Sequence, residues 1–144
     1  MRYLLQFILT SCLMLRFGFT HADVTITDAW VRASNAGQSV GAAYVTFTSP
    51  QDVSLVYVEA ARAGNTEIHS MTMQNGVMKM RHMDELAIPA NQPVKLAPGG
   101  FHLMLFNLKS PFKTGEKIKF KFCFKDKSGQ IQEKFVSLPV KAAQ

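Results

Sequence analysis

Histidine and methionine side chains are concentrated in one short stretch of this sequence. After residue 22, every methionine and every histidine falls between residues 69 and 104. Methionine usually fills gaps in a core, and a single histidine in a strand is usually an ordinary polar residue. The set as a whole is hard to explain that way, because alternating positions place thioethers beside imidazoles where a core face would carry Val, Ile or Leu. The candidate metal ligands are therefore His69, Met71, Met73, Met78, Met80, His82, Met83, His102 and Met104.

The two side-chain types point to a soft metal ion. The thioether sulfur of methionine is neutral and polarisable, and it selects Cu(I), or its mimic Ag(I), over hard divalent ions. Imidazole is acceptable to copper in both oxidation states. Zinc would be expected to take thiolates or more imidazoles, and calcium or magnesium would take oxygen ligands. The sequence therefore predicts Cu(I) as the bound ion.

A turn signal predicts how part of this set is held. Asn75-Gly76 lies between two alternating segments and is typical of a two-residue type I′ hairpin. Such a loop pairs Gln74 with Val77. The side chains of successive pairs then point alternately to the two faces of the hairpin. One face receives Met73 opposite Met78, Met71 opposite Met80, and His69 opposite His82. A different loop length would change this register, so the geometry depends on the turn.

A second candidate strand carries a similar pair of ligands. In the segment from Phe101 to Phe106, alternation places His102 and Met104 on the same face. This strand therefore offers an imidazole and a thioether two residues apart.

Alternation with a period of two runs through most of the chain after residue 22. The expected strands are 24–32, 40–48, 53–61, 66–73, 77–83, 94–96, 101–108, 117–125 and 131–138. No segment has a convincing helical pattern, and so many short strands predict an antiparallel β-sandwich or Greek-key barrel. The residues expected in its core are Trp30, Tyr44, Phe47, Tyr57, Phe120, Phe122 and Phe124.

The composition favours one globular domain. A chain of 144 residues with 47% apolar and 18% charged residues suits a single core, and it is unlike a disordered or repetitive chain. Cys12 and Cys123 cannot form a disulfide scaffold, and their spacing fits neither a zinc knuckle nor a redox pair. Stability must therefore come from packing.

Residues 1–22 have the features of a secretory signal peptide, with Arg2 before an apolar segment and Ala22 at the end. We expect cleavage after Ala22 and a copper-binding β-sandwich domain over residues 23–144. The apolar segment is interrupted and short for a membrane span, so we expect no membrane insertion of the mature chain. The segment Leu9-Thr10-Ser11-Cys12 resembles a lipobox, which leaves lipoprotein anchoring at Cys12 as a second alternative.

A group of seven lysines lies between residues 109 and 127, in a chain with a formal net charge of +6. A basic patch would suit an acidic partner or an anionic surface. The alternation from Lys117 to Lys125 instead favours a strand with a solvated lysine face, which is a common protection of a sheet edge. We expect the solvated face and no nucleic-acid partner.

The spacing of four candidate ligands resembles the signature of a known family. Ten residues separate His69 from Met80, twenty-one separate Met80 from His102, and one separates His102 from Met104. This spacing resembles that of the periplasmic copper chaperones of the PCu(A)C family. The similarity extends over most of residues 23–140, and the segments that carry it are Ile68-His-Ser-Met-Thr-Met, Gly76-Val-Met-Lys-Met-Arg and Pro98-Gly-Gly-Phe-His-Leu-Met-Leu.

The resemblance implies an all-β, cupredoxin-like antiparallel Greek-key β-sandwich with a partly exposed Cu(I) site. It implies a periplasmic protein that delivers copper toward the CuA centre of cytochrome c oxidase. The copper-accepting partner would be subunit II of that oxidase or a helper chaperone. We expect the carrier to be a monomer.

The resemblance also implies the ligands, which are His69, Met80, His102 and Met104. The auxiliary candidates are Met71, Met78 and His82. His82 and Met83 depart from the family pattern, so a second or a shifted ligand set stays open. The C-terminal tail lacks an extension rich in His and Met, so we expect one high-affinity copper.

Other functions stay open from the sequence alone. A cupredoxin-like electron carrier would need a His₂Cys set with an axial Met, but alternation puts Cys123 on the lysine face. An envelope copper-buffering protein would bind the ion without passing it on, and a structural or adhesive sandwich would carry its methionines incidentally. An enzyme, either a copper oxidase or a thiol protein, would need a substrate site. Neighbouring lysines could lower the pKa of Cys123, but no resolving cysteine or catalytic motif accompanies it. We therefore expect no catalysis and a half-exposed structural thiol.

Overall fold

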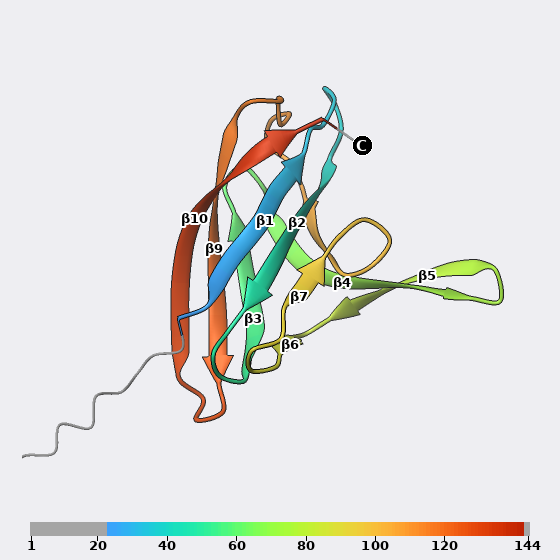
Figure 1. Ribbon diagram of the computed structural model, residues 1–144. Coiled ribbons are helices and arrows are strands. Elements are labelled where there is room, and N and C mark those ends of the chain that lie inside the picture. The colour runs from blue at the N-terminus through green and yellow to red at the C-terminus, as the bar shows by residue number, and fades with distance from the viewer. Residues whose placement is uncertain (1–22, 143–144) are drawn as a thin grey trace, which may run out of the picture.

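The computed structural model describes residues 23–142, in which every regular element is a β-strand (Figure 1). The expected signal peptide and Cys12 lie outside the described residues. The strands are β1 (Thr25–Arg32), β2 (Val40–Thr48), β3 (Val53–Ala60), β4 (Asn65–Gln74), β5 (Val77–Met83), β6 (Leu86–Ile88), β7 (Val94–Leu96), β8 (His102–Phe106), β9 (Lys117–Asp126) and β10 (Ile131–Lys141).

The strands form two layers that are joined along β1 and β10. The first layer has the order β5-β4-β8-β2-β1, and β7 also pairs with β2. The second layer has the order β10-β9-β3-β6. β1 runs parallel to β10, with Val31 opposite Val140, and the neighbours within each layer are antiparallel. This arrangement confirms the predicted all-β, cupredoxin-like fold class.

The core lies between the two layers. Phe47 of β2 meets Phe122 and Phe124 of β9 edge-on, with ring centroids 5.2 and 5.4 Å apart. All three rings are almost completely buried. Apolar side chains from the inward faces of both layers therefore hold the sandwich together.

Two aromatic residues expected in the core are placed differently. Tyr57 is 51% exposed, because the register of β3 against β9 shifts between Leu55 and Tyr57. This bulge turns Tyr57 outward and brings Val58 into the core. Trp30 is only partly buried, and its ring packs on Tyr44 with the centroids 4.7 Å apart.

The lysine-rich strand β9 lies between β10 and β3, so its lysines do not protect a sheet edge as expected. The solvated face itself is confirmed, since Lys117 and Lys119 are exposed. Lys121 forms an ion pair with Glu59 at 3.0 Å. The alternation predicted the face of the strand correctly but not its place in the sheet.

The hairpin of β4 and β5 projects out of the sandwich (Figure 1). β4 pairs with β8 from Asn65 to His69, and beyond His69 its only strand partner within residues 23–142 is β5. Asn75 and Gly76 have φ angles of 51° and 75°, as a type I′ turn requires. The predicted register is confirmed along the whole hairpin. We call residues 70–81 the hairpin arm.

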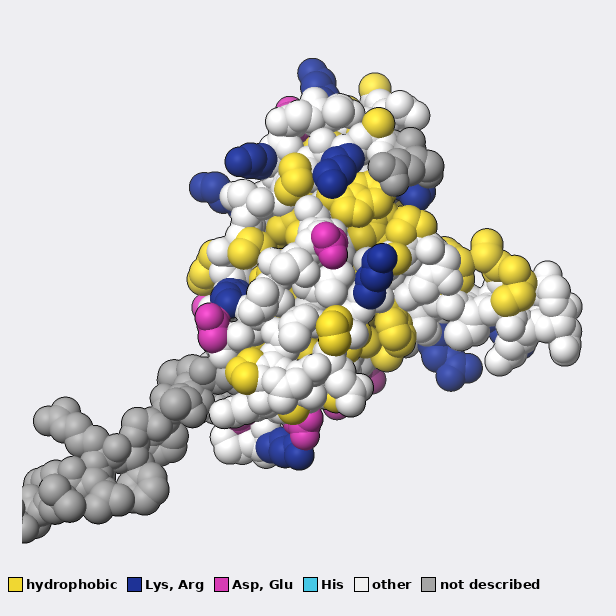
Figure 2. All heavy atoms as spheres, viewed as in Figure 1, with side chains coloured by type: hydrophobic (Ala, Val, Ile, Leu, Met, Phe, Trp, Pro, Cys, Tyr) yellow, Lys and Arg dark blue, Asp and Glu magenta, His cyan; other side chains and the backbone are white. Residues whose placement is uncertain are grey.

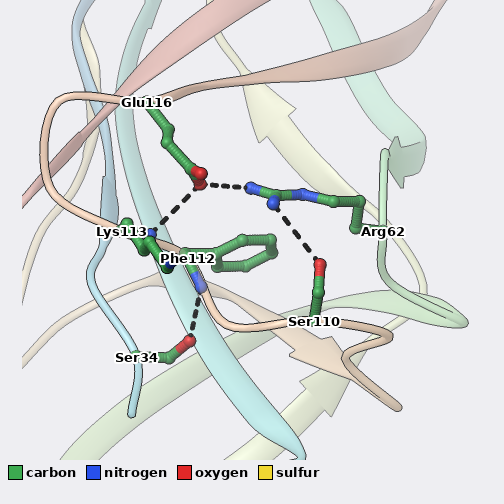
Figure 3. A network of polar contacts seen from close by, with 6 residues as sticks. All are labelled: Ser34, Arg62, Ser110, Phe112, Lys113 and Glu116. Carbon is green, nitrogen blue, oxygen red and sulfur yellow. Dashed lines mark hydrogen bonds and ion pairs between the residues drawn. The ribbon is translucent and has the colours of Figure 1, made fainter. Parts of the chain in front are cut away.

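A polar network around Phe112 fastens three loops to one another (Figure 3). Arg62 donates a hydrogen bond to Glu116 at 2.7 Å and another to Ser110 at 3.3 Å. The backbone N–H of Phe112 donates to the Ser34 hydroxyl at 2.9 Å. The hydrogen bond from Arg62 is the main cause that lowers the pKa of Glu116, so this carboxylate stays ionised.

Backbone hydrogen bonds also connect these loops to the two strands that carry His69 and His102. Gly64 N–H donates to the carbonyl of Phe106 at 2.8 Å, and Lys109 N–H donates to the carbonyl of Arg62 at 2.8 Å. A Cβ on Gly64 would lie only 2.9 Å from Cβ of Asn107. The start of β4 is therefore held close against the end of β8.

Candidate metal centre

The candidate ligands of β4 and β8 lie on the outer face of the first layer. Ile68 and Leu103 are buried in the core between the layers. Because side chains alternate along a strand, His69, His102 and Met104 point to the opposite face. The site is thus built on the outside of the sandwich, where the hairpin arm leaves it.

Three histidines form a row across β5, β4 and β8. His69 is the register partner of His82 on one side and of His102 on the other. The ring centroid of His69 is 5.8 Å from each of the other two. The structure therefore brings His69 and His102, which are far apart in sequence, next to each other.

His102 is held with one ring nitrogen free for a metal ion. Its Nδ1 lies 2.9 Å from the carbonyl oxygen of Gly100. A carbonyl only accepts, so Nδ1 carries the hydrogen and Nε2 carries the lone pair. Nε2 is buried, and no polar atom of residues 23–142 hydrogen-bonds to it. A buried acceptor without a partner is costly, and a metal ion would satisfy it.

His69 is oriented in a similar way by Glu67. Its Nε2 lies 2.8 Å from Oε2 of Glu67, whose other oxygen accepts a hydrogen bond from Asn65 at 2.9 Å. The hydrogen bond from His69 is the main cause that lowers the pKa of Glu67, against an opposing effect of desolvation. The ionised carboxylate only accepts, so Nε2 carries the hydrogen. Nδ1 is then a buried acceptor, again without a partner in the described part of the chain.

Glu67 and the carbonyl of Gly100 were not found by the sequence analysis. Glu67 precedes His69 by two residues, so the alternation that grouped the histidines also places Glu67 on their face. It is also the register partner of Met104. Its negative charge would offset the positive charge of a Cu(I) ion bound here, which four neutral ligands would leave uncompensated.

The two methionines of the implied ligand set lie diagonally on either side of His69. Met104 follows His102 by two residues on β8, and Met80 is the register partner of Met71 on β5. Diagonal neighbours have Cα atoms roughly 7–8 Å apart, which is within reach of long side chains. Met104 is partly buried, whereas Met80 is 56% exposed. His69 is therefore adjacent to the other three residues of the set.

The auxiliary candidates differ in their placement. His82 is exposed, and its Nδ1 lies 3.9 Å from a carboxylate oxygen of Asp84. Met71 is partly buried beside His69, and Met78 is exposed further along the hairpin arm. Met83 packs against the core, so it faces away from this group.

The donor set around the histidines is rich in thioethers rather than in thiolates or oxygen ligands. Within residues 23–142, no group of three or more His, Cys, Asp and Glu side chains is arranged to hold a metal ion. The neighbouring methionines offer thioethers beside the histidines, and thioether ligands favour Cu(I).

Cys123 does not belong to this centre. Phe122 and Phe124 point into the core, so Cys123 lies on the outer face of the second layer, between Tyr57 and Glu133. The structure therefore does not assemble the His₂Cys set of an electron carrier. Cys123 is also buried rather than half-exposed. Burial is the main cause that raises the pKa of its thiol, and Lys121 opposes this only in part, so the neighbouring lysines do not activate the thiol.

Known proteins with similar sequences place the chain in a family. The family described as "Putative lipoprotein LpqE-like" matches residues 24–140. The "Putative lipoprotein Lxx21020" of Leifsonia xyli subsp. xyli is 32% identical over 119 residues, which are 82% of this chain and 69% of that protein. Among residues 23–142, no helix has the length and hydrophobicity to cross a bilayer.

Solved structures with the same fold include two that hold copper. The copper-bound PCuAC domain from PmoF2 has a TM-score of 0.66 and 21% identity, with 83% of this chain and 93% of that chain covered. The solution structure of Cu(I)-bound DR1885 from Deinococcus radiodurans has a TM-score of 0.57 and 27% identity, with 88% and 81% covered. The resemblance noted in the sequence is thus confirmed. The chain belongs to the LpqE-like family, and its fold is that of the PCuAC domains.

Proposed function

We propose that this protein is a periplasmic copper chaperone that binds one Cu(I) tightly through His69, Met80, His102 and Met104. The observation that carries the proposal is a pair of buried imidazole nitrogens, Nδ1 of His69 and Nε2 of His102, on paired strands. Neither nitrogen has a hydrogen-bond partner within residues 23–142. The copper-bound PmoF2 domain and Cu(I)-bound DR1885 support copper as the cargo on this fold.

The ligand set suits a carrier because its two ends differ in exposure. His102 is 4% exposed, whereas Met80 is 56% exposed on the hairpin arm. An incoming ligand from a partner can replace the exposed thioether first and the buried imidazole last. The ion then moves by stepwise ligand exchange without being released into water. Nothing is oxidised or cleaved in these exchange steps, so the protein acts by binding rather than by catalysis.

The acceptor we propose is a copper-accepting protein of the bacterial envelope. Subunit II of cytochrome c oxidase, at its CuA centre, or a helper chaperone for that centre fits the cargo. The expected signal peptide and the lipoprotein name of the relative from Leifsonia support export.

Competition titration tests the ligand set directly. The protein purified after export is titrated with Cu(I) against a colorimetric chelator, and we expect one tight equivalent. His102→Ala and Met104→Leu should each weaken binding at least about tenfold while the circular dichroism spectrum stays unchanged. Met83→Leu is the matched control, because Met83 packs against the core, and it should bind as the wild type does. Unchanged affinity in either ligand variant would show that this set is wrong.

Two further measurements separate a carrier from a buffer. X-ray absorption of the Cu(I) form should count two sulfur and two nitrogen neighbours. Mixing the loaded protein with a copper-free CuA domain should then transfer the ion at a rate that increases with acceptor concentration. Transfer that proceeds only at the rate of spontaneous copper loss would instead indicate a buffer.

A further inference from the structure

Four methionines line one face of the hairpin. Met71 lies opposite Met80, and Met73 lies opposite Met78. Met73 is 66% exposed and Met78 is 61% exposed. The opposite face of the hairpin arm is polar apart from Val77 at the turn, and its members are Ser70, Thr72, Gln74, Val77, Lys79 and Arg81.

Packing does not explain the methionines at the tip. Beyond His69, β4 pairs with β5 and with no other strand of residues 23–142. Met73 and Met78 are not members of the hydrophobic core or of the residues packed against it. Figure 2 shows hydrophobic side chains on this arm, away from the body of the molecule. Single exposed apolar residues are ordinary, but two directly opposed thioethers on a solvated ribbon call for another reason.

The turn geometry brings the sulfur atoms within reach of one ion. In a two-residue hairpin the pair that flanks the loop, here Gln74 and Val77, is hydrogen-bonded, and hydrogen-bonded and non-hydrogen-bonded pairs then alternate. Met73 and Met78 therefore form a non-hydrogen-bonded pair, with Cα atoms about 4.5 Å apart. Met71 is the diagonal neighbour of Met78, roughly 7–8 Å away between Cα atoms and within reach of a long side chain.

We propose that Met71, Met73 and Met78 form a second Cu(I) site, made of thioethers alone, on the hairpin arm. Three neutral sulfur ligands suit a soft monovalent ion and exclude hard divalent ions. The site is weaker than the histidine site, because it is exposed and has neither an imidazole nor a carboxylate like Glu67. The binding of an ion here does not depend on the proposed chaperone function, but the role of the site in transfer rests on it.

Met71 connects the second site to the histidine site. Met71 is paired with Met80 and is two residues from His69, so soft ligands continue from the tip of the arm to the histidines. A Cu(I) ion received at Met73 and Met78 can move inward by exchanging one ligand at a time. The ion keeps its charge and oxidation state throughout, so no other reactant is needed.

Silver titration with methionine methyl NMR tests the second site. The exported protein, labelled with ¹³C at the methionine methyl groups, is titrated with silver nitrate, since Ag(I) mimics Cu(I) and is not oxidised. We expect the first equivalent to shift the methyl signals of Met80 and Met104. The second equivalent should shift those of Met71, Met73 and Met78. Signals of Met73 and Met78 that stay in place at two equivalents would overturn the proposal.

Two double variants test the thioether site and the histidine site separately. Met73→Leu/Met78→Leu should lower the affinity for the second equivalent at least tenfold and leave the first unchanged, whereas Met83→Leu should leave both unchanged. A second binding event that survives in the double variant would overturn the site. In His69→Ala/His102→Ala, the tip signals should still shift. If they do so while the wild type shows no binding at Met80 and Met104, the proposed histidine site fails and the thioether site stands.

Discussion

At the scale of single residues, Glu67 determines which ring nitrogen of His69 is free to bind a metal ion. Its carboxylate accepts the Nε2 hydrogen of His69 at 2.8 Å and leaves Nδ1 as the acceptor. It also supplies a negative charge beside Met104, its register partner. Carboxylates that orient a ligating histidine typically contribute 10–100-fold in metal affinity, by the general behaviour of such sites.

Replacement of this carboxylate should therefore weaken copper binding without unfolding the protein. Glu67→Gln keeps the size of the side chain and removes its charge, and we expect a loss of Cu(I) affinity of about tenfold. Chelator competition measures the affinity, and thermal unfolding checks the fold. Glu59→Gln is the control, because Glu59 lies on the second layer and pairs with Lys121. Equal affinities for Glu67→Gln and the wild type would contradict the role given to Glu67.

The thiol of Cys123 should react slowly in the folded protein. Burial raises its pKa above the ordinary value of 9.0, so the reactive thiolate is scarce at neutral pH. We expect iodoacetamide to alkylate Cys123 at least about tenfold more slowly in the native protein than in guanidinium chloride. Mass spectrometry of the peptide that contains Cys123 gives both rates. Similar rates would mean that the thiol is not buried and that its pKa is not raised.

At the scale of strands and turns, the hairpin was predictable because its signal is local. Asn75-Gly76 fixes a two-residue turn, and the register of β4 and β5 follows from it. Other features depend on distant parts of the chain. The bulge that turns Tyr57 outward arises only against β9. Local alternation also could not reveal that β9 lies between two neighbours.

The turn at the end of the hairpin arm should influence copper binding without affecting the core. Gly76 has a φ of 75°, and a Cβ there would meet no atom within 4 Å, so only backbone strain opposes a side chain. Gly76→Ala should destabilise the hairpin arm by about 1–2 kcal/mol and leave the melting temperature of the sandwich nearly unchanged. Because Met80 depends on this register, Cu(I) affinity should fall several-fold. Amide hydrogen exchange in the arm measures the first effect, and chelator competition measures the second.

Gly129 provides the matched control for this substitution. Its φ is 86°, and it is equally open, but it lies in the turn between β9 and β10 on the other layer. Gly129→Ala should impose similar backbone strain with unchanged Cu(I) affinity. A loss of affinity in both variants would show that the effect comes from general destabilisation.

The buried ring of Phe112 should contribute to the stability of the whole sandwich. It is fully buried, and the guanidinium carbon of Arg62 lies 5.1 Å from the ring centroid. The ring thus joins the polar network of Figure 3 to the core. Phe112→Ala should lower the free energy of unfolding by about 3–5 kcal/mol, as measured by urea denaturation. A loss below about 1 kcal/mol would mean that the loops repack without it.

At the scale of the whole molecule, the candidate centre lies where a rigid sandwich meets a projecting arm. The ligand set of His69, Met80, His102 and Met104 was implied by the resemblance to the PCu(A)C family, and alternation and one turn place most of its members on shared faces. The free nitrogens on His69 and His102 were not readable. They follow from contacts with Glu67 and Gly100, which exist only once β4 and β8 are paired.

A metal ion bound at this junction should stabilise the entire fold, because the unfolded chain does not hold these four ligands together. At a free Ag(I) concentration 100 times the dissociation constant, the gain in unfolding free energy is about 2.7 kcal/mol. In a domain of this size, that gain raises the melting temperature by several degrees, which circular dichroism detects. His69→Ala/His102→Ala should lose most of this rise, whereas Met73→Leu/Met78→Leu should keep it, since the arm tip lies outside the core. A full rise in the histidine variant would mean that the stabilising ion binds elsewhere.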